Sequence, residues 1–149
     1  MTSDRYPLRP DSDWYDALVA AYGEEVPAIA RMRFRRGLQS HVDAMDAQLK
    51  DLGLLPHVDI LSITSRGAGY VVIYAKYQSG IYEDDRIALD FCFERHAKAL
   101  REACEHCGTT AEIVVKIGME ALLANPSIDI GDRCLCSPCA DAFQKECAR

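Results

Sequence analysis

Apolar residues spaced three or four positions apart predict three helices in the first two thirds of the chain. The first, capped by Asp11 or Ser12, spans residues 11–23, the second spans 38–52, and a third, long helix spans 85–103. Their expected apolar faces are, in order, Trp14, Leu18, Ala21 and Tyr22; Leu38, Val42, Met45, Leu49 and Leu52; and Ile87, Ala88, Phe91, Cys92, Arg95, Ala99, Leu100 and Ala103.

The polar residues of the second helix indicate which of its faces is exposed to solvent. On the second helix, Gln39, Asp43, Asp46 and Lys50 fall between the apolar residues and are expected outside. The segment 24–37 predicts a short helix, because a proline suits a helix's first turn and the glycine at its end breaks the helix.

The pattern changes from helical to alternating near residue 57, which predicts an antiparallel hairpin. Its strands are residues 57–65 and 69–78, both rich in β-branched and aromatic side chains, with a turn at 66–68. The second strand is apolar on both sides, so we expect Tyr70, Val72 and Tyr74 to be interior or covered. If that row is bare, it becomes a candidate surface for a partner or for self-association.

After the long helix, shorter elements are predicted. Residues 111–117 alternate like a strand, 118–131 form a short helix-like piece and a loop, 133–136 return as a strand, and a final helix begins near Pro138. The predicted fold class is α+β: N-terminal helices on a small antiparallel hairpin, a long helix, and a C-terminal treble-clef or zinc-ribbon module. We divide the chain into an α+β domain, 1–103, and a zinc-binding module, 104–149, packed as one globular unit.

The strongest chemical signal is a pair of Cys-x-x-Cys motifs. Cys104 and Cys107 form the first and Cys136 and Cys139 the second, and Gly108 follows the first pair, where a knuckle around a sulfur needs a residue that tolerates positive φ. Two such pairs can hold the four corners of a tetrahedron around Zn(II). We therefore predict one structural zinc ion.

The other cysteines and a histidine in the knuckle are weaker candidates. Cys134 is a possible alternative ligand, because it lies two residues before Cys136 on the same strand. Cys147 lies too far along the final helix to share the ion, and Cys92 is expected in the core. His106 is expected to be solvated, since four thiols already complete the site.

Composition narrows the function. The chain of 149 residues carries 17 Lys and Arg against 23 Asp and Glu, a net charge of −6 at pH 7, without a polybasic tail. It contains no apolar run of the roughly 20 residues that span a bilayer, and its start does not resemble a signal peptide. We expect a cytoplasmic protein without a membrane partner. Thiols stay reduced there, which favours metal over disulfides.

One basic cluster offers an alternative function. Four arginines surround an aromatic residue, so the segment could contact phosphates and stack on a base. The acidic balance favours instead a solvated face that pairs with neighbouring acids. The candidate nucleic-acid contacts are Arg31, Arg33, Phe34, Arg35 and Arg36.

No catalytic motif accompanies these features. We find no Ser-His-Asp order, no Gly-rich phosphate loop and no His-Glu-x-x-His, and a site closed by four sulfurs keeps no position for water. The sequence therefore predicts a protein that is not an enzyme.

Several positions match a family pattern: a Phe and a Gly before the second helix, an aromatic strand after Gly, an acidic loop, and the two ligand pairs. They are Phe34, Gly37, Gly69, Tyr70 to Tyr74, Tyr82 to Asp85, Cys104, Cys107, Gly108, Leu135, Cys136, Cys139 and Ala140. Over residues 30–149 the chain resembles uncharacterised zinc-ribbon-like proteins of bacteria and of phages or plasmids. The resemblance implies a zinc-binding protein from a mobile element.

Two functions remain. We expect a small zinc-stabilised protein that binds another protein, as an adaptor or inhibitor. The alternative is a nucleic-acid-binding regulator that uses the zinc module and the cluster from Arg31 to Arg36.

Overall fold

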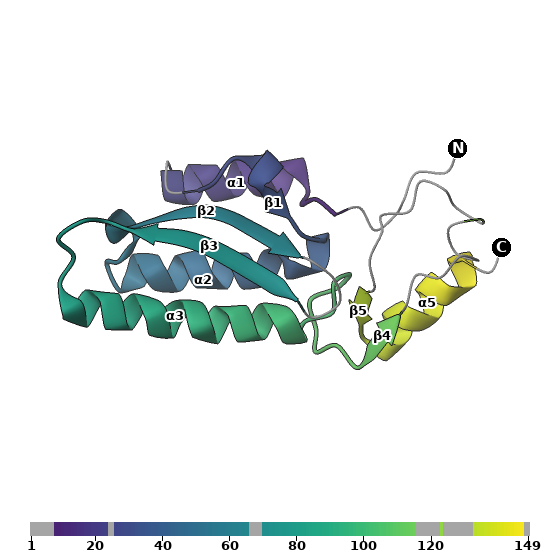
Figure 1. The fold of residues 1–149 in the computed structure, drawn as a ribbon. Helices are drawn as coiled ribbons and strands as arrows, with labels where there is room; N and C mark the ends of the chain where they lie inside the picture. The colour runs from purple at the N-terminus through teal and green to yellow at the C-terminus, as the bar shows by residue number, and fades with distance from the viewer. Residues whose placement is uncertain (1–7, 24–25, 66–69, 116–122, 124–132, 148–149) are drawn as a thin grey trace.

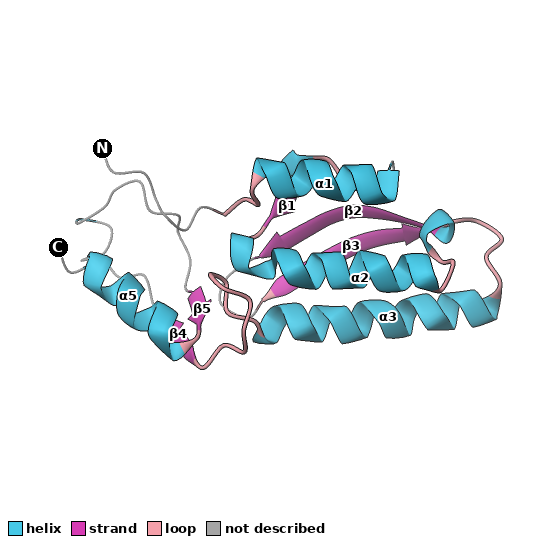
Figure 2. Cartoon of the chain, turned by 180° about the vertical axis from the view of Figure 1, so that it is seen from behind, coloured by secondary structure: helices cyan, strands magenta, loops and turns pink. Residues whose placement is uncertain are grey.

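Three α-helices lie on one face of a small β-sheet in the computed structural model of this chain (Figures 1 and 2). The structure describes residues 8–23, 26–65, 70–115, 123 and 133–147. Within these residues the fold is mixed α+β, with four α-helices, a three-stranded sheet and a two-stranded sheet. The α+β class predicted from the sequence is confirmed.

The three predicted helices are present with nearly the expected bounds. They are α1 (Ser12–Tyr22), α2 (Gln39–Asp51) and α3 (Glu83–Glu102). α1 ends at Gly23, whose φ of 72° is accessible to glycine at little cost. α3 begins two residues before the predicted start, and this places three acidic residues in its first turn, where carboxylates suit the helix dipole.

The sheet contains the predicted hairpin and one additional strand. β2 (Val58–Ser65) pairs antiparallel with β3 (Val71–Tyr77), as predicted. β1 (Met32–Arg33) pairs with β2 in parallel, and the strand order is β1-β2-β3. β3 is therefore an edge strand within the described residues.

The short helix predicted over 24–37 is wrong for the residues that the structure describes there, 26–37. The chain forms 3-10 turns at Ile29–Arg31 and Arg36–Leu38 on either side of β1. Met32 and Phe34 are both buried, with exposed Arg33 between them. This alternation suits a strand, but it is too short to outweigh the proline and glycine signals that favoured a helix.

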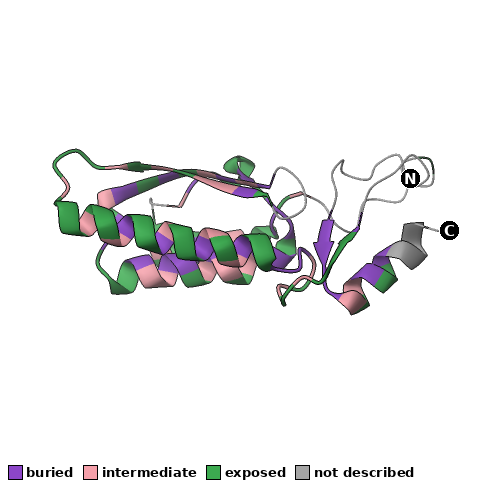
Figure 3. Ribbon diagram, turned by 60° about the horizontal axis from the view of Figure 1, so that its bottom comes forward, coloured by how far each residue is buried: buried purple, intermediate pink, exposed green. Residues whose placement is uncertain are grey.

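The expectation that Tyr70, Val72 and Tyr74 are interior or covered is also wrong. Tyr70 and Tyr74 are 58% and 43% exposed, and Val72 is half-buried. The reason is that the helices cover one face of the sheet only (Figure 3). Alternate side chains of β3 therefore point away from the helices. This row of side chains is therefore a candidate surface for a partner or for self-association.

The main core lies between the helices and the sheet. Its most buried members come from every element of this layer: Leu18, Met32, Phe34, Leu38, Val42, Met45, Leu49, Val58, Ile63, Val71, Leu89, Cys92 and Leu100.

One acidic residue is buried among them. Asp46 is 4% exposed, although the helical pattern placed it outside. α2 lies between α1 and α3, so its buried arc is wider than one stripe (Figure 2).

Asp46 should make the protein less stable as the pH rises. Burial, followed by the nearby charge of Asp43, raises the pKa of Asp46 to about 7. When the pKa of a carboxyl is higher in the folded than in the unfolded state, the protein becomes less stable as the pH rises from ~4 to ~7. The unfolding free energy falls by up to about 4 kcal/mol over this range and then levels off. Asp46→Asn should therefore raise the denaturation midpoint at pH 8 and much less at pH 4.5.

Urea unfolding at both pH values measures this effect. Asp51→Asn is the matched control, because Asp51 is exposed at the end of the same helix. Equal effects of the two variants at pH 8 would contradict the account of Asp46.

Two large apolar residues of α3 are not buried. Ile87 and Phe91 are 57% and 68% exposed, although the sequence placed both on the apolar face. The buried residues of α3 are Leu89, Cys92, His96 and Leu100, which lie on the opposite side of the helix. The predicted apolar stripe was thus too broad, and part of it faces solvent.

The C-terminal part follows the predicted order. β4 (Ile113–Val115) pairs antiparallel with β5 (Arg133–Leu135), and α5 (Ser137–Cys147) follows. A second small core gathers Cys104, Val115, Leu135, Cys136, Ala140 and Phe143. The helix-like piece and loop predicted at 118–131 lie outside the described residues apart from Leu123. Among the described helices, none has the length and apolar composition needed to cross a membrane.

Candidate metal centre

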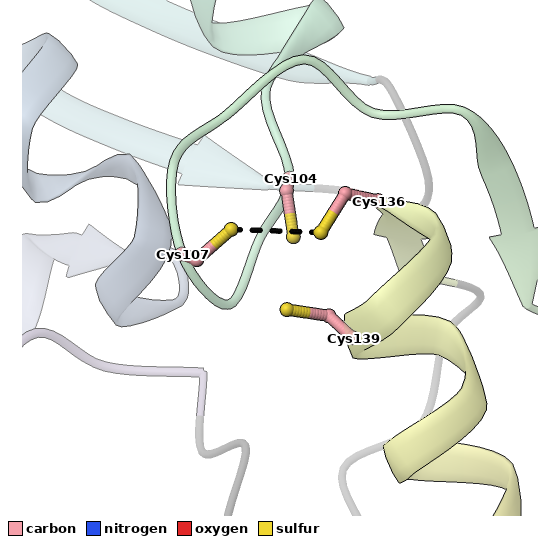
Figure 4. Close-up of side chains that lie close together, drawn as sticks. All are labelled: Cys104, Cys107, Cys136 and Cys139. Atoms are coloured by element: carbon pink, nitrogen blue, oxygen red, sulfur yellow. Dashed lines mark hydrogen bonds between the residues drawn. The ribbon is translucent and has the colours of Figure 1, made fainter.

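The two predicted cysteine pairs meet at one point. The sulfur atoms of Cys104, Cys107, Cys136 and Cys139 all lie within 4.8 Å of one another and face a common centre (Figure 4). The Sγ atoms of Cys107 and Cys136 are 3.6 Å apart. A tetrahedral ion with metal–sulfur bonds of about 2.3 Å needs sulfurs about 3.8 Å apart. The four cysteines are therefore close enough to bind a metal ion, and none of the described cysteines is in a disulfide.

The first pair sits on a tight turn after α3. The backbone N–H of Gly108 donates to the carbonyl of Cys104 at 2.9 Å, and that of Cys104 donates to the carbonyl of Thr109. Gly108 has a φ of 86°, the positive value that the motif predicted. This turn directs both sulfurs to the same side.

The second pair is positioned by a strand and a helix. Cys136 directly follows β5, and its carbonyl accepts the N–H of Ala140 at 2.9 Å, which begins the first turn of α5. Cys139 lies in that turn. Cys104 and Cys136 are buried, Cys139 is half-buried and Cys107 is exposed, so the centre approaches solvent on the side of Cys107.

Three of these thiols, those of Cys104, Cys107 and Cys139, have shifted pKa values. A hydrogen bond from the Thr109 hydroxyl, 3.1 Å away, is the main cause that lowers the pKa of Cys107 to about 6. Burial raises the pKa of Cys104 and of Cys139, and backbone N–H groups near the Cys104 sulfur act in the opposite direction. Cys107 is therefore more easily ionised than Cys104 and Cys139, and a bound cation would favour the thiolate form of all four.

The remaining sequence candidates lie apart from this centre. Cys134 is not among the four converging sulfurs, and burial raises the pKa of its thiol. Cys92 is buried in the main core, as expected, and the side chain of Cys147 lies outside the described part of the chain. His106 is half-buried instead of fully solvated, and it lines a cavity of about 570 Å³ beside Cys107.

A buried ion pair fixes the knuckle to the helical layer. Glu105, between the first two cysteines, lies 3.1 Å from the guanidinium of Arg35, and both side chains are 3% exposed. Its second carboxylate oxygen accepts the N–H of Cys134 at 2.7 Å, and its own N–H donates to the carbonyl of Cys134 at 2.8 Å. One side chain thus joins the segment between β1 and α2, the first cysteine pair and the strand before the second pair.

Two glycines permit a close backbone approach at the same place. The N–H of Gly37 donates to the carbonyl of Glu105 at 3.0 Å, and a Cβ on Gly37 would lie 2.4 Å from the carbonyl oxygen of Cys104. A Cβ on Gly108 would lie 2.7 Å from the carbonyl oxygen of Gly37. His41 also bonds the carbonyl of Gly108 at 2.7 Å.

Gly37→Ala should therefore displace the knuckle. The added methyl group meets backbone, which cannot rotate away, so we expect a loss of about 1–3 kcal/mol in unfolding free energy. Amide exchange at residues 104–108 should accelerate as well. Gly53→Ala is the comparison, because open space surrounds that position and only its φ of 69° strains the backbone. Unchanged exchange at the knuckle in Gly37→Ala would contradict the close approach.

The basic cluster is not a continuous surface. Phe34 is fully buried and contacts Trp14 edge-to-face, so it cannot stack on a base, and Arg35 is held in the ion pair with Glu105. Three of the predicted contacts, Arg31, Arg33 and Arg36, are exposed. Arg36 lies 3.9 Å from the carboxylate of Asp11.

The sequence reasoning did not identify the roles of Glu105, Arg35 or Gly37. Glu105 occupies a position between ligands where any residue type fits the motif, and a charged residue there normally suggests exposure.

Comparison of the chain with protein-family models, with curated proteins and with solved structures gives no match.

Proposed function

We propose that this chain is a small protein-binding protein, an adaptor or inhibitor, whose C-terminal part is held by one structural Zn(II). The observation that carries the proposal is the convergence of four cysteine sulfurs on a backbone that is fixed to the helical layer by the pair Arg35–Glu105. Four thiolates in a tetrahedral arrangement suit Zn(II) better than hard cations such as Mg(II) or Ca(II).

The order of elements supports a treble-clef arrangement. A knuckle with Cys104 and Cys107 is followed by the paired strands β4 and β5, and the second ligand pair lies at the start of α5. In such a module the ion links a turn to a helix start, so each element stabilises the other through the metal.

A structural role for the ion follows from its ligands. Four protein sulfurs fill a tetrahedral shell and leave no position for water or substrate, which supports a protein that is not an enzyme. The ion would hold a rigid surface in place. A cytoplasmic location belongs to the proposal, because thiols stay reduced there.

A protein partner is favoured over nucleic acid by charge and burial. The chain has net charge −6, and the aromatic residue of the basic cluster, Phe34, is buried. Phosphate binding requires a basic surface. The origin in a mobile element rests on the family resemblance and stays a prediction.

Two experiments test the proposal. Zinc-loaded protein immobilised through its N-terminus should retain a stoichiometric protein from cells of its native host, identified by mass spectrometry, and Cys139→Ser should retain less of it. Labelled random-sequence DNA and RNA should not bind at about 0.1 M salt. Binding that falls steeply with salt and is lost in the triple variant of Arg31, Arg33 and Arg36 would instead support the nucleic-acid regulator.

A further inference from the structure

The edge strand β3 lies above a row of carboxylates on α3. Residues 83, 90, 94 and 101 share one flank of α3, because they are separated by whole numbers of helical turns. Asp90 accepts a hydrogen bond from the Tyr77 hydroxyl, and the Arg101 Nε donates to the carbonyl of Val71 at 3.3 Å. These two contacts, at the two ends of β3, align this flank with the strand.

Alternate residues of β3 offer backbone groups to the open edge. The N–H of Gln78 donates to His57 at the start of β2, whereas the carbonyl of Val71 bonds Arg101 on α3. Successive residues of a strand direct their N–H and C=O groups to opposite edges. The backbone groups of Ile73 and Ala75 therefore point away from β2, and β3 has no further strand beside it among the described residues.

Among the described residues, this edge has little of the usual protection of exposed strands. β3 is seven residues long, contains no proline, and has one charged side chain, Lys76. Proteins normally protect such an edge with prolines, several charges or a covering element. On the face that the helices leave bare, Tyr70 and Tyr74 are exposed beside it. The edge is therefore suited to pair with another strand.

Charge specifies which strand fits. A strand added beside β3 would direct alternate side chains towards the flank of α3, where Glu83, Asp90 and Glu94 are exposed. Two cations accompany these carboxylates: Arg86 lies 3.5 Å from Glu83, and Arg101 bonds the carbonyl of Val71. Lys or Arg side chains would meet carboxylates, while apolar side chains on the other face would lie beside Tyr74. A second copy of the chain would bring two such acidic flanks together.

We propose that β3, with the carboxylates of Asp90 and Glu94 beneath it, binds an extended segment of a partner protein in which basic and apolar residues alternate. The segment adds as a fourth strand. Main-chain hydrogen bonds supply affinity, and the alternation of side chains supplies specificity. The inference rests on the proposed protein-binding function and names its surface and the chemistry of its partner.

The test uses full-length zinc-loaded protein and two labelled nine-residue peptides. One alternates Lys with Val and the other alternates Glu with Val. Fluorescence anisotropy should show the Lys peptide binding at least tenfold more tightly than the Glu peptide. Equal binding of the two peptides, or no binding of the Lys peptide at millimolar protein, would overturn the proposal.

Two variants locate the binding. Ala75→Pro removes an N–H of the open edge and spares the hydrogen bonds to β2, because edge strands accept proline where the N–H faces solvent. Glu94→Lys reverses one charge of the flank. Each substitution should weaken binding of the Lys peptide about tenfold or more. The matched control, Glu102→Lys, makes the same charge change on another side of α3 and should stay within twofold of the wild type.

Circular dichroism must show that Ala75→Pro is folded, and if it is not, Glu94→Lys against Glu102→Lys decides alone. Retained peptide binding in folded Ala75→Pro, or equal losses in the two charge variants, would overturn the proposal. A dimer in sedimentation velocity that Ala75→Pro abolishes would also overturn it, because a second copy then covers the edge. A host partner that still binds Ala75→Pro would leave the proposed function standing while this inference fails.

Discussion

Glu105→Gln should destabilise the protein by about 3–5 kcal/mol, the largest effect expected from a single charge change in the chain. The substitution keeps the shape of the side chain and an oxygen for the N–H of Cys134. It removes the charge that faces Arg35 at 3.1 Å, and both side chains are 3% exposed. A buried guanidinium that loses its carboxylate is costly, because water cannot replace the lost partner.

A double-mutant cycle separates this effect from general damage. Arg35→Met combined with Glu105→Gln should be more stable than Glu105→Gln alone, because it leaves neither charge of this pair buried. Glu83→Gln is the matched surface control. Glu83 pairs with Arg86 at 3.5 Å, but both side chains are more than half exposed, so its loss should cost less than about 1 kcal/mol. Urea unfolding at constant free zinc gives the unfolding free energies of the wild type, the two single variants and the double variant. Additive effects of Arg35→Met and Glu105→Gln would contradict a buried pair.

Removal of the metal should unfold the C-terminal part and spare the helical layer. Zinc binding by comparable peptides contributes on the order of 10 kcal/mol or more near neutral pH. Strands of three residues, as in β4 and β5, are too short to pair stably without it. The core between α2, α3 and the sheet has its own apolar contacts, so we expect it to persist without the ion.

Hydrogen exchange with and without a zinc chelator measures this division. Protection should be lost at residues 104–115 and 133–147, and it should persist in the middle of α2 and in β2. Added zinc should restore the lost protection. Equal loss of protection in α2 and in the C-terminal part would show that the two regions unfold together, and no loss in either would show that the metal is not structural.

The helices and the hairpin were predictable because their patterns are long. α2 and α3 repeat apolar residues over three turns or more, and the strands of the hairpin are rich in β-branched and aromatic residues over eight and seven positions. The four converging cysteines were predictable for another reason: two Cys-x-x-Cys pairs have a spacing that suits a tetrahedral metal ion, and this signal depends little on the rest of the fold.

Other features depend on which elements become neighbours, and local pattern does not contain that information. Asp46 is buried because α2 is flanked on both sides, and Phe91 is exposed because α3 lies at the edge of its layer. β1 exists because β2 offers it an edge. Glu105 is buried because Arg35, 70 residues earlier, meets it there.

Metal content measured on purified protein tests the central claim most directly. The wild type should contain one zinc ion per chain by elemental analysis and native mass spectrometry. Cys107→Ser and Cys139→Ser should lose the ion, whereas Cys92→Ser, Cys134→Ser and Cys147→Ser should keep it. Two zinc ions per chain, none, or loss of the ion on changing Cys92 would contradict a single structural site at Cys104, Cys107, Cys136 and Cys139.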